Sequence, residues 1–338
     1  KINFQNPLRF LPIKIWLLLI IYMLVSFLWA INVIESLATW NRWLVIIISV
    51  FILTIFLTNN IKLFRTLVYI TIIISFINVL VCIIGYYYLD VYISQRNNLM
   101  LNGGYGNKNI FAVCLLFKLP LLYYAVIRYK KFWRYSSLVL IGLICFCLII
   151  ISTRSSFIGL FFQLIILFAY ALVSYFRFHK TKKYALQFGL VILVALFGFF
   201  LGNKFIEYNY NHYAKKDVKN FYTVGARVKT IEDGNSKGRL RIWKNTIAII
   251  KMKPITGYGV GNHKLAIMKV ECAKKMDYVV SDHAHNDFLE MMSELGIGGE
   301  LLYILLYASM GIMAIIMIMN KKIKEHYRLM ALCSLMLL

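Results

Sequence analysis

The sequence is short of acidic residues, of charge in general and of proline. It holds 14 Asp and Glu against 38 Lys and Arg, only 15% of its residues are charged, and four are proline. Apolar residues make up 61% of the chain, whereas soluble domains rarely exceed about half. This composition excludes an ordinary soluble protein and predicts an all-α polytopic membrane protein.

The cysteines form no disulfide framework, and the sequence has no internal repeat or low-complexity tract. Of the six cysteines, only Cys272 lies outside the apolar segments. Cys145 and Cys147 lack the C-x-x-C spacing of a zinc or redox pair. We therefore expect these two to be buried as small apolar residues.

Apolar runs of about the 20 residues that cross a bilayer recur along the chain. They cover 15–34, 43–58, 66–89, 109–127, 136–152, 156–176, 184–202 and 299–319, and a ninth begins at about 328. The chain starts at Lys1 and stops at Leu338 inside an apolar run, so we expect incomplete ends. The sequence predicts a bundle of about nine or more transmembrane helices.

Basic residues mark one side of the predicted membrane. The loops after the second, fourth, sixth and eighth spans are rich in Lys and Arg, whereas the turns between them, such as that with Glu35 and Arg42, carry little charge. Basic short loops stay cytoplasmic. We therefore predict an N-terminal bundle (1–202), a large extracytoplasmic, partly helical loop (203–298) and C-terminal helices (299–338). The net charge of +24 is explained by basic residues placed at the membrane, so no nucleic acid partner is expected.

The outer loop divides into short segments. It is interpreted as polar coil over 203–237 and an amphipathic helix over about 239–253, followed by a Pro/Gly turn. Leu240, Trp243 and Ile247 recur at helical spacing in this helix, which would lie on the membrane surface or cap the bundle.

The glycines of GYGVGN, residues 257–262, resemble a nucleotide loop at first sight. No strand precedes them and no Walker lysine-hydroxyl pair follows, so a flexible turn is the better interpretation.

The stretch HAHNDFLE, residues 283–290, allows three interpretations. His283 and His285 could bind a metal with neighbouring carboxylates, one of them could act as a general base, or both could be the solvated end of a span. Asn286 and Asp287 have the pattern of a helix start.

Three arginines on the predicted outer side are candidate anion ligands. Arg154 stands alone in the turn STRSSFIGL, where a cation runs against the positive-inside bias. Arg239 and Arg241 open the amphipathic helix and could hold phosphate oxygens as a guanidinium fork. All three could equally anchor the chain at lipid headgroups.

Two further polar features border the fourth span. Asn107 and Asn109 follow a glycine-rich turn and could cap the helix or bind a polar ligand. Lys118 lies within the span just before Pro120, and an intramembrane lysine is a functional candidate by default.

In chain order, four stretches resemble motifs of the bacterial O-antigen ligase / O-antigen polymerase superfamily of membrane glycosyltransferases. They are GYGNKNIFAVCLLFKLP, STRSSFIGL, GRLRIWKNTIAIIKMKPITGYGVGN and HAHNDFLEMMSELGIGG, and together they extend from about 102 to 300. Each is weak alone, and the ordered set is specific. The chain departs at Lys108, where many members have Pro, at Ser155, where many have Gly, and in having fewer spans.

The resemblance implies a glycan donor on undecaprenyl diphosphate and transfer without metal, nucleotide or other cofactor at the periplasmic face of the bacterial inner membrane. Arg154 and Arg239, with Arg241 beside them, would hold the diphosphate. His285 would be the base, His283 its helper, and Asn286, Asn107, Asn109 and Lys118 would line the substrate site.

The acceptor stays open at this stage. A ligase would use lipid A-core, a polymerase a second lipid-linked repeat, and a protein O-oligosaccharyltransferase a protein hydroxyl. A lipid-linked sugar flippase is the alternative from another class, but it would spread its charged residues through the spans rather than gather them on one side.

Overall fold

The computed structural model describes residues 7–60, 62–91, 101–178, 182–213, 234–272 and 281–338, and every element in these ranges is helical. Eight helical segments are long and apolar enough to cross a membrane. They are Leu11–Trp29, Val33–Leu57, Lys62–Tyr87, Lys108–Arg128, Lys131–Ile151, Arg154–Arg177, Leu186–Tyr208 and Asp287–Met319. The predicted all-α polytopic membrane fold is confirmed, and the predicted ninth span corresponds to the 13-residue helix α13, Glu325–Leu337.

Packing divides the chain into two compact units. The first combines residues 1–63 with 232–312, and the second combines 64–231 with 313–338. This division reflects packing within the chain. The boundaries at 202 and 298 concern the sides of the membrane, and they stay a prediction.

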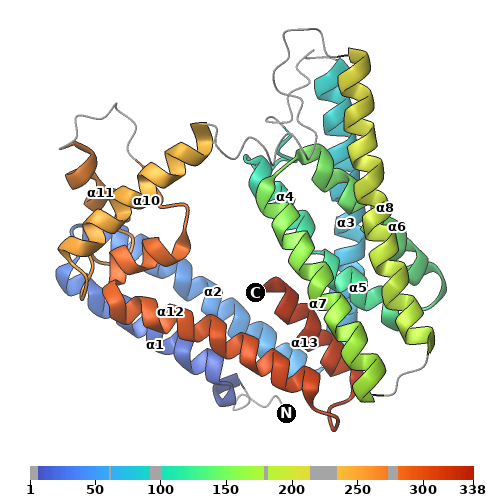
Figure 1. Cartoon of the computed structure of the whole chain (residues 1–338). Coiled ribbons are helices and arrows are strands. Elements are labelled where there is room, and N and C mark those ends of the chain that lie inside the picture. Colours follow the sequence, from blue (N-terminus) through green and yellow to red (C-terminus); the bar gives the residue numbers. More distant parts are fainter. Residues whose placement is uncertain (1–6, 61, 92–100, 179–181, 214–233, 273–280) are drawn as a thin grey trace. The chain divides into compact units, whose positions relative to one another are not determined.

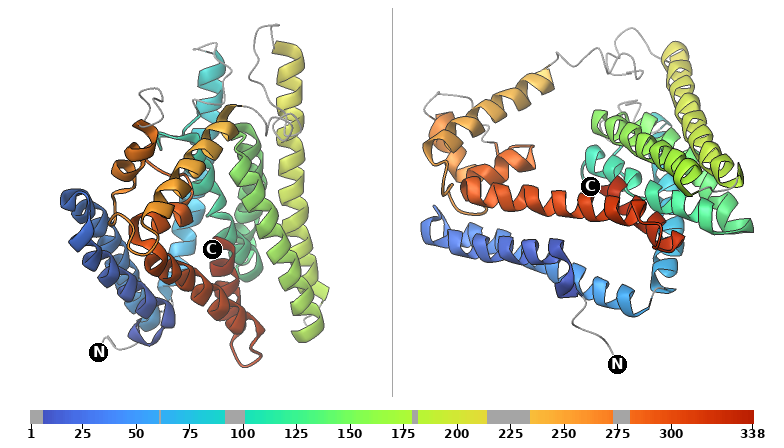
Figure 2. Two further views of the ribbon diagram at one scale, coloured as in Figure 1. Left: turned by 60° about the vertical axis from the view of Figure 1, so that its left-hand side comes forward. Right: turned by 60° about the horizontal axis from the view of Figure 1, so that its bottom comes forward.

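The first unit contains three long helices and the histidine stretch. Its elements are η1 (Pro7–Arg9), α1 (Leu11–Val25), η2 (Ser26–Trp29), α2 (Val33–Asn59), α10 (Gly234–Met252), α11 (His263–Glu271) and α12 (Asp287–Met319) through residue 312. Helices α1, α2 and α12 run side by side (Figures 1 and 2). Buried apolar side chains such as Leu19, Ile47 and Leu295 form their shared core. This core fixes the N-terminal ends of α2 and α12, which carry the site.

The second unit is a bundle around α6 and α8. Its elements are α3 (Lys62–Val91), α4 (Lys108–Leu116), α5 (Leu119–Arg128), α6 (Lys131–Ile151), α7 (Arg154–Phe178), α8 (Lys182–Tyr213) and α13. A Cβ atom at Gly198 of α8 would overlap the carbonyl oxygen of Gly142 on α6. Small residues permit this backbone approach, as they do in many membrane bundles. Helices α6 and α8 are labelled next to each other in Figure 1 and pack side by side.

The helix of the seventh span continues beyond the apolar run. The coil predicted from residue 203 is wrong as far as Tyr213, because α8 extends to that residue. The prediction failed because hydropathy marks the membrane-spanning part of a helix and not its end. The ion pair of Lys204 with Glu207, at 2.8 Å and three residues apart, is a local contact that a polar helix can use. Residues 214–233 of the predicted coil lie outside the described ranges.

Candidate functional site

Asn286 caps the long helix α12. Its Oδ1 accepts hydrogen bonds from the backbone N–H groups of Phe288 (3.1 Å) and Leu289 (3.3 Å), which satisfies two donors that a helix start leaves open. The predicted helix start is therefore confirmed. His285, immediately before the cap, has φ of 52°. This left-handed conformation is uncommon outside glycine and is concentrated at functional sites.

Glu290 reaches back from the first turn of α12 to the histidine stretch. Its Oε1 lies 2.9 Å from Nδ1 of His283, and its Oε2 accepts a hydrogen bond of 2.8 Å from the backbone N–H of Ala284. One carboxylate thus holds both a side chain and the backbone of the stretch. The histidine next to it keeps its Nε2 edge available.

Trp243 joins α10 to the same stretch from the other side. Its indole N–H donates to the carbonyl oxygen of Ala284 at 3.0 Å. Arg239 lies four residues before Trp243 and therefore on the same face of α10. The arginine-bearing end of this helix and His285 consequently belong to one region of the first unit.

The amphipathic helix predicted over about 239–253 is confirmed as α10, which begins at Gly234, inside the predicted coil. Leu240 and Ile247 are exposed, whereas Ile242 and Ile249 join a cluster with Tyr258 and residues of α11. Helical periodicity was correct, but the sequence did not reveal that this helix packs against α11. The exposed apolar side chains remain available to a membrane surface, as a surface helix requires.

The glycine loop after Pro254 is held against a kink in α12. The backbone N–H groups of Tyr258 and Gly259 donate to the carbonyl oxygens of Ser293 (3.1 Å) and Glu294 (2.8 Å). These carbonyls are free because Gly296 has non-helical φ and ψ (65° and −167°). Cβ atoms at Gly257 or Gly296 would overlap backbone across this contact. The predicted turn is confirmed, and its glycines permit close packing against α12.

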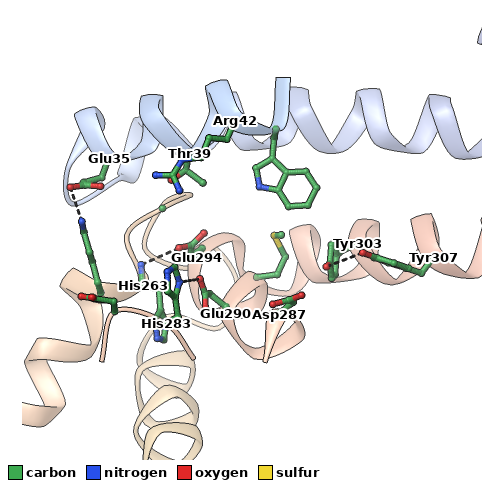
Figure 3. Close-up of a pocket in the computed structure, with 15 residues that line it drawn as sticks. Glu35, Thr39, Arg42, His263, His283, Asp287, Glu290, Glu294, Tyr303 and Tyr307 are labelled. Atoms are coloured by element: carbon green, nitrogen blue, oxygen red, sulfur yellow. Dashed lines mark hydrogen bonds and ion pairs between the residues drawn. The ribbon is translucent and has the colours of Figure 1, made fainter. Parts of the chain in front are cut away.

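A cavity of about 550 Å³ opens beside the histidine stretch, between the N-terminal parts of α2 and α12 (Figure 3). Its lining residues all belong to the first unit: Glu35, Thr39, Arg42, Trp43, Gly261, His263, Lys264, Asp282, His283, Asp287, Glu290, Met291, Glu294, Tyr303 and Tyr307. Lys264 Nζ and Glu35 Oε1 form an ion pair of 2.8 Å across it. The turn with Glu35 and the segment with Lys264 were both predicted to lie outside the membrane, so the topology predicts their proximity.

His263 forms part of the cavity wall and is almost fully buried, with 1% of its surface exposed. Its Nδ1 lies 2.9 Å from Oγ of Ser293, and its backbone N–H donates to Oε1 of Glu294 at 3.2 Å. Its Nε2 has no hydrogen-bond partner among the described residues. Burial lowers the pKa of the His263 ring below its ordinary value of 6.5, and the nearby charge of Glu290 opposes this only in part.

The structure brings some of the predicted site residues together. His283 lines the cavity, and Asn286 caps the helix next to it. His285, Arg239 and Arg241 are exposed and do not line the cavity, and no described residue hydrogen-bonds to the His285 ring. Among the described His, Cys, Asp and Glu side chains, no group of three is arranged to hold a metal ion.

Several cavity residues carried no motif in the sequence. These are Glu35, Thr39, Arg42 and Trp43 on α2, Lys264 on α11, and Tyr303 and Tyr307 on α12. The α2 residues lie more than 200 positions before those of α11 and α12, so no local window contains them all. The scarcity of acidic residues was the one available signal, since five of the 14 line this cavity.

Arg154 lies in the second unit, as the first residue of α7. The turn before it is compact: Ser152 ends α6 with φ of 55°, and the hydroxyls of Thr153 and Ser156 are hydrogen-bonded at 2.7 Å. Arg154 as a whole is half-buried at the helix start. A rigid turn of this kind presents a side chain in one place.

Asn107 and Lys118 have structural partners in the second unit. The Oδ1 of Asn107 accepts a hydrogen bond of 2.8 Å from the backbone N–H of Asn109 and caps α4. The ammonium group of Lys118 donates to the carbonyl oxygen of Cys114 at 2.8 Å, where the predicted fourth span breaks into α4 and α5 before Pro120. Both residues therefore stabilise the backbone, whatever else they bind.

The comparison with known families agrees with this arrangement. The fold defines a multi-pass membrane protein, and residues 139–304 match the family model described as O-antigen ligase. The match covers about half of the chain, and it confirms the resemblance of its motifs to the O-antigen ligase / O-antigen polymerase superfamily. No curated protein and no solved structure matches the chain.

Proposed function

We propose that this protein is a glycosyltransferase that moves a glycan from undecaprenyl diphosphate to a sugar hydroxyl of lipid A-core, as an O-antigen ligase, at the periplasmic face of the inner membrane. The family match and the membrane-spanning helices support the class of reaction. The charge-based topology supports the side of the membrane, because it places the arginines and histidines together outside.

The reaction requires a base for the acceptor and a cationic site for the leaving group. His285 takes the proton of the acceptor hydroxyl, whose oxygen attacks the anomeric carbon as the bond from that carbon to the diphosphate oxygen breaks. Arg239 and Arg241 stabilise the departing undecaprenyl diphosphate, and the motif resemblance assigns Arg154 to the same role. An in-line attack inverts the anomeric carbon. His283 supports the base from the neighbouring position.

One observation carries this assignment: the hydrogen bond of 3.0 Å from the indole N–H of Trp243 to the carbonyl oxygen of Ala284. It ties the helix that carries Arg239 to the backbone beside His285, and so it supports a leaving-group site in the same unit as the base. The left-handed backbone of His285 fits a functional role, since such conformations cluster at active sites.

The test uses purified full-length protein, EDTA and a defined undecaprenyl-diphosphate-linked glycan. Wild type and His285→Ala are each offered lipid A-core, or donor alone, and products are separated by size. We expect product on lipid A-core from wild type and a loss of about 10²-fold or more in the variant. Longer donor-linked chains without acceptor would make the protein a polymerase instead. Full activity of the variant would remove His285 as the base.

A further inference from the structure

The cavity of the first unit is acidic in a strongly basic protein. Five carboxylates line it, against two permanent cations, Arg42 and Lys264. Lys264 is already paired with Glu35, while Arg42 has no ion pair within the described residues. A diphosphate would be repelled here, because like charges in a partly enclosed site interact strongly. The cavity and the arginines of α10 are therefore suited to different parts of the reactants.

Three aromatic residues form one wall of the cavity. Trp43 meets Tyr303 edge-to-face with ring centroids 6.3 Å apart, and Tyr303 meets Tyr307 in the same way at 5.0 Å. The two tyrosine hydroxyls lie 3.3 Å apart. Sugar rings offer C–H faces to aromatic rings and hydroxyl edges to carboxylates, which accept up to four hydrogen bonds each. Rings and carboxylates thus line the same space (Figure 3).

A buried polar group in the wall also indicates a ligand. His263 is 1% exposed, and its Nε2 has no partner among the described residues although Nδ1 is bonded to Ser293. Buried polar atoms are normally paired, so an unpaired one in a cavity wall calls for a partner from outside the chain. The cavity volume of about 550 Å³ lies within the roughly 300–1,000 Å³ of small-molecule sites.

We propose that this cavity binds the acceptor sugar, and that it selects a neutral or amino-bearing sugar ring over one with a carboxylate or phosphate. This inference rests on the proposed function, because the bound sugar is an acceptor only if the protein transfers a glycan to it. His283 is at the cavity wall and His285 is two residues further, so a sugar held here would present a hydroxyl toward the base. The diphosphate of the donor would then lie on the α10 side, at Arg239 and Arg241.

The test measures binding rather than turnover. Full-length protein in nanodiscs is titrated at pH 7 with methyl glucoside, methyl glucosaminide, methyl glucuronide and inorganic diphosphate, and contacts are read by saturation-transfer NMR. We expect the first two probes to bind and the glucuronide to bind about tenfold more weakly, because of like charge. Inorganic diphosphate should not displace the glucoside.

Matched variants locate the signal. Trp43→Ala and Tyr307→Ala should lower the glucoside signal severalfold, whereas Tyr135→Ala, an exposed tyrosine of the second unit, should not change it. Asp287→Asn should reduce the difference in affinity between glucuronide and glucoside, because it removes one negative charge from the cavity. Thermal unfolding identifies any variant that fails to fold. If Tyr307→Ala fails to fold, Tyr307→Phe, which keeps the ring, replaces it.

The outcomes separate this inference from the proposed function. The inference would be overturned if glucuronide or diphosphate bound as strongly as glucoside and this binding depended on Trp43. It would also be overturned if no sugar gave a signal that depends on Trp43. His285→Ala should bind the probes as wild type does. Lost transfer with retained binding supports both proposals, while retained transfer in that variant contradicts only the base assignment.

Discussion

Glu290 Oε1 lies 2.9 Å from Nδ1 of His283, and the other oxygen of this carboxylate holds the backbone N–H of Ala284. We predict that Glu290→Ala releases the histidine stretch and lowers transfer by up to about 100-fold, since small displacements of catalytic groups are costly. Glu290→Gln keeps an acceptor for the backbone and should lose less. Steady-state kinetics with Glu207→Gln as a control outside the cavity would check this, and an unaltered rate in the alanine variant would refute it.

Asn286 both caps α12 and is proposed to touch the substrate. Asn286→Ala should lower stability by about 1 kcal/mol through loss of the cap, whereas Asn286→Asp keeps a capping oxygen and should unfold at the wild-type temperature. The aspartate variant should nevertheless transfer more slowly, because a carboxylate cannot donate a hydrogen bond to a sugar hydroxyl. If it is both stable and fully active, Asn286 is a cap alone.

The glycine loop and the kink of α12 should tolerate no side chain. Gly296→Ala and Gly257→Ala combine a positive φ with overlap onto backbone, so we expect losses of about 2–5 kcal/mol from strain and overpacking together. Gly104→Ala has the positive φ but open space, and should cost only about 1–2 kcal/mol. Thermal unfolding in detergent measures the order, and equal losses for all three would contradict the packing argument.

Gly198 should matter more than Gly189, although both lie in α8. A methyl group at 198 meets the backbone of α6, so Gly198→Ala should destabilise the bundle by about 1–3 kcal/mol. No atom of the described residues lies within 4 Å of a Cβ at 189, where Ala should be neutral or stabilising by about 0.5–1 kcal/mol. Thermal unfolding of both variants tests the α6–α8 contact directly.

Acid should weaken the first unit through His263. Burial lowers the pKa of His263 in the folded state, so its stabilising contribution is present above the unfolded pKa, near 6.5, and is lost as the pH falls through this value. The groups that act on it are Glu290 and Glu271, which favour the charged ring, and His283, which disfavours it. Unfolding temperatures between about pH 7.5 and 5.5 should fall less in His263→Gln than in wild type. Parallel curves would show that other groups govern the acid response.

The sequence by itself determined the membrane fold, the order of spans and the family. An apolar run of about 20 residues has few alternatives to a transmembrane helix, because a bilayer leaves no partner for unpaired backbone groups. The helix start at Asn286 was equally local, since a cap depends on the next three residues.

The tertiary structure alone decided which residues form the cavity. Glu35, Lys264 and Tyr307 are far apart in the chain, and only the packing of α2, α11 and α12 brings them together. The packing of the glycine loop likewise depends on free carbonyl oxygens at the kink of a helix more than 30 residues away. Local patterns specify helices and caps, whereas a site built by long-range contacts depends on side-chain packing that no short segment of sequence encodes.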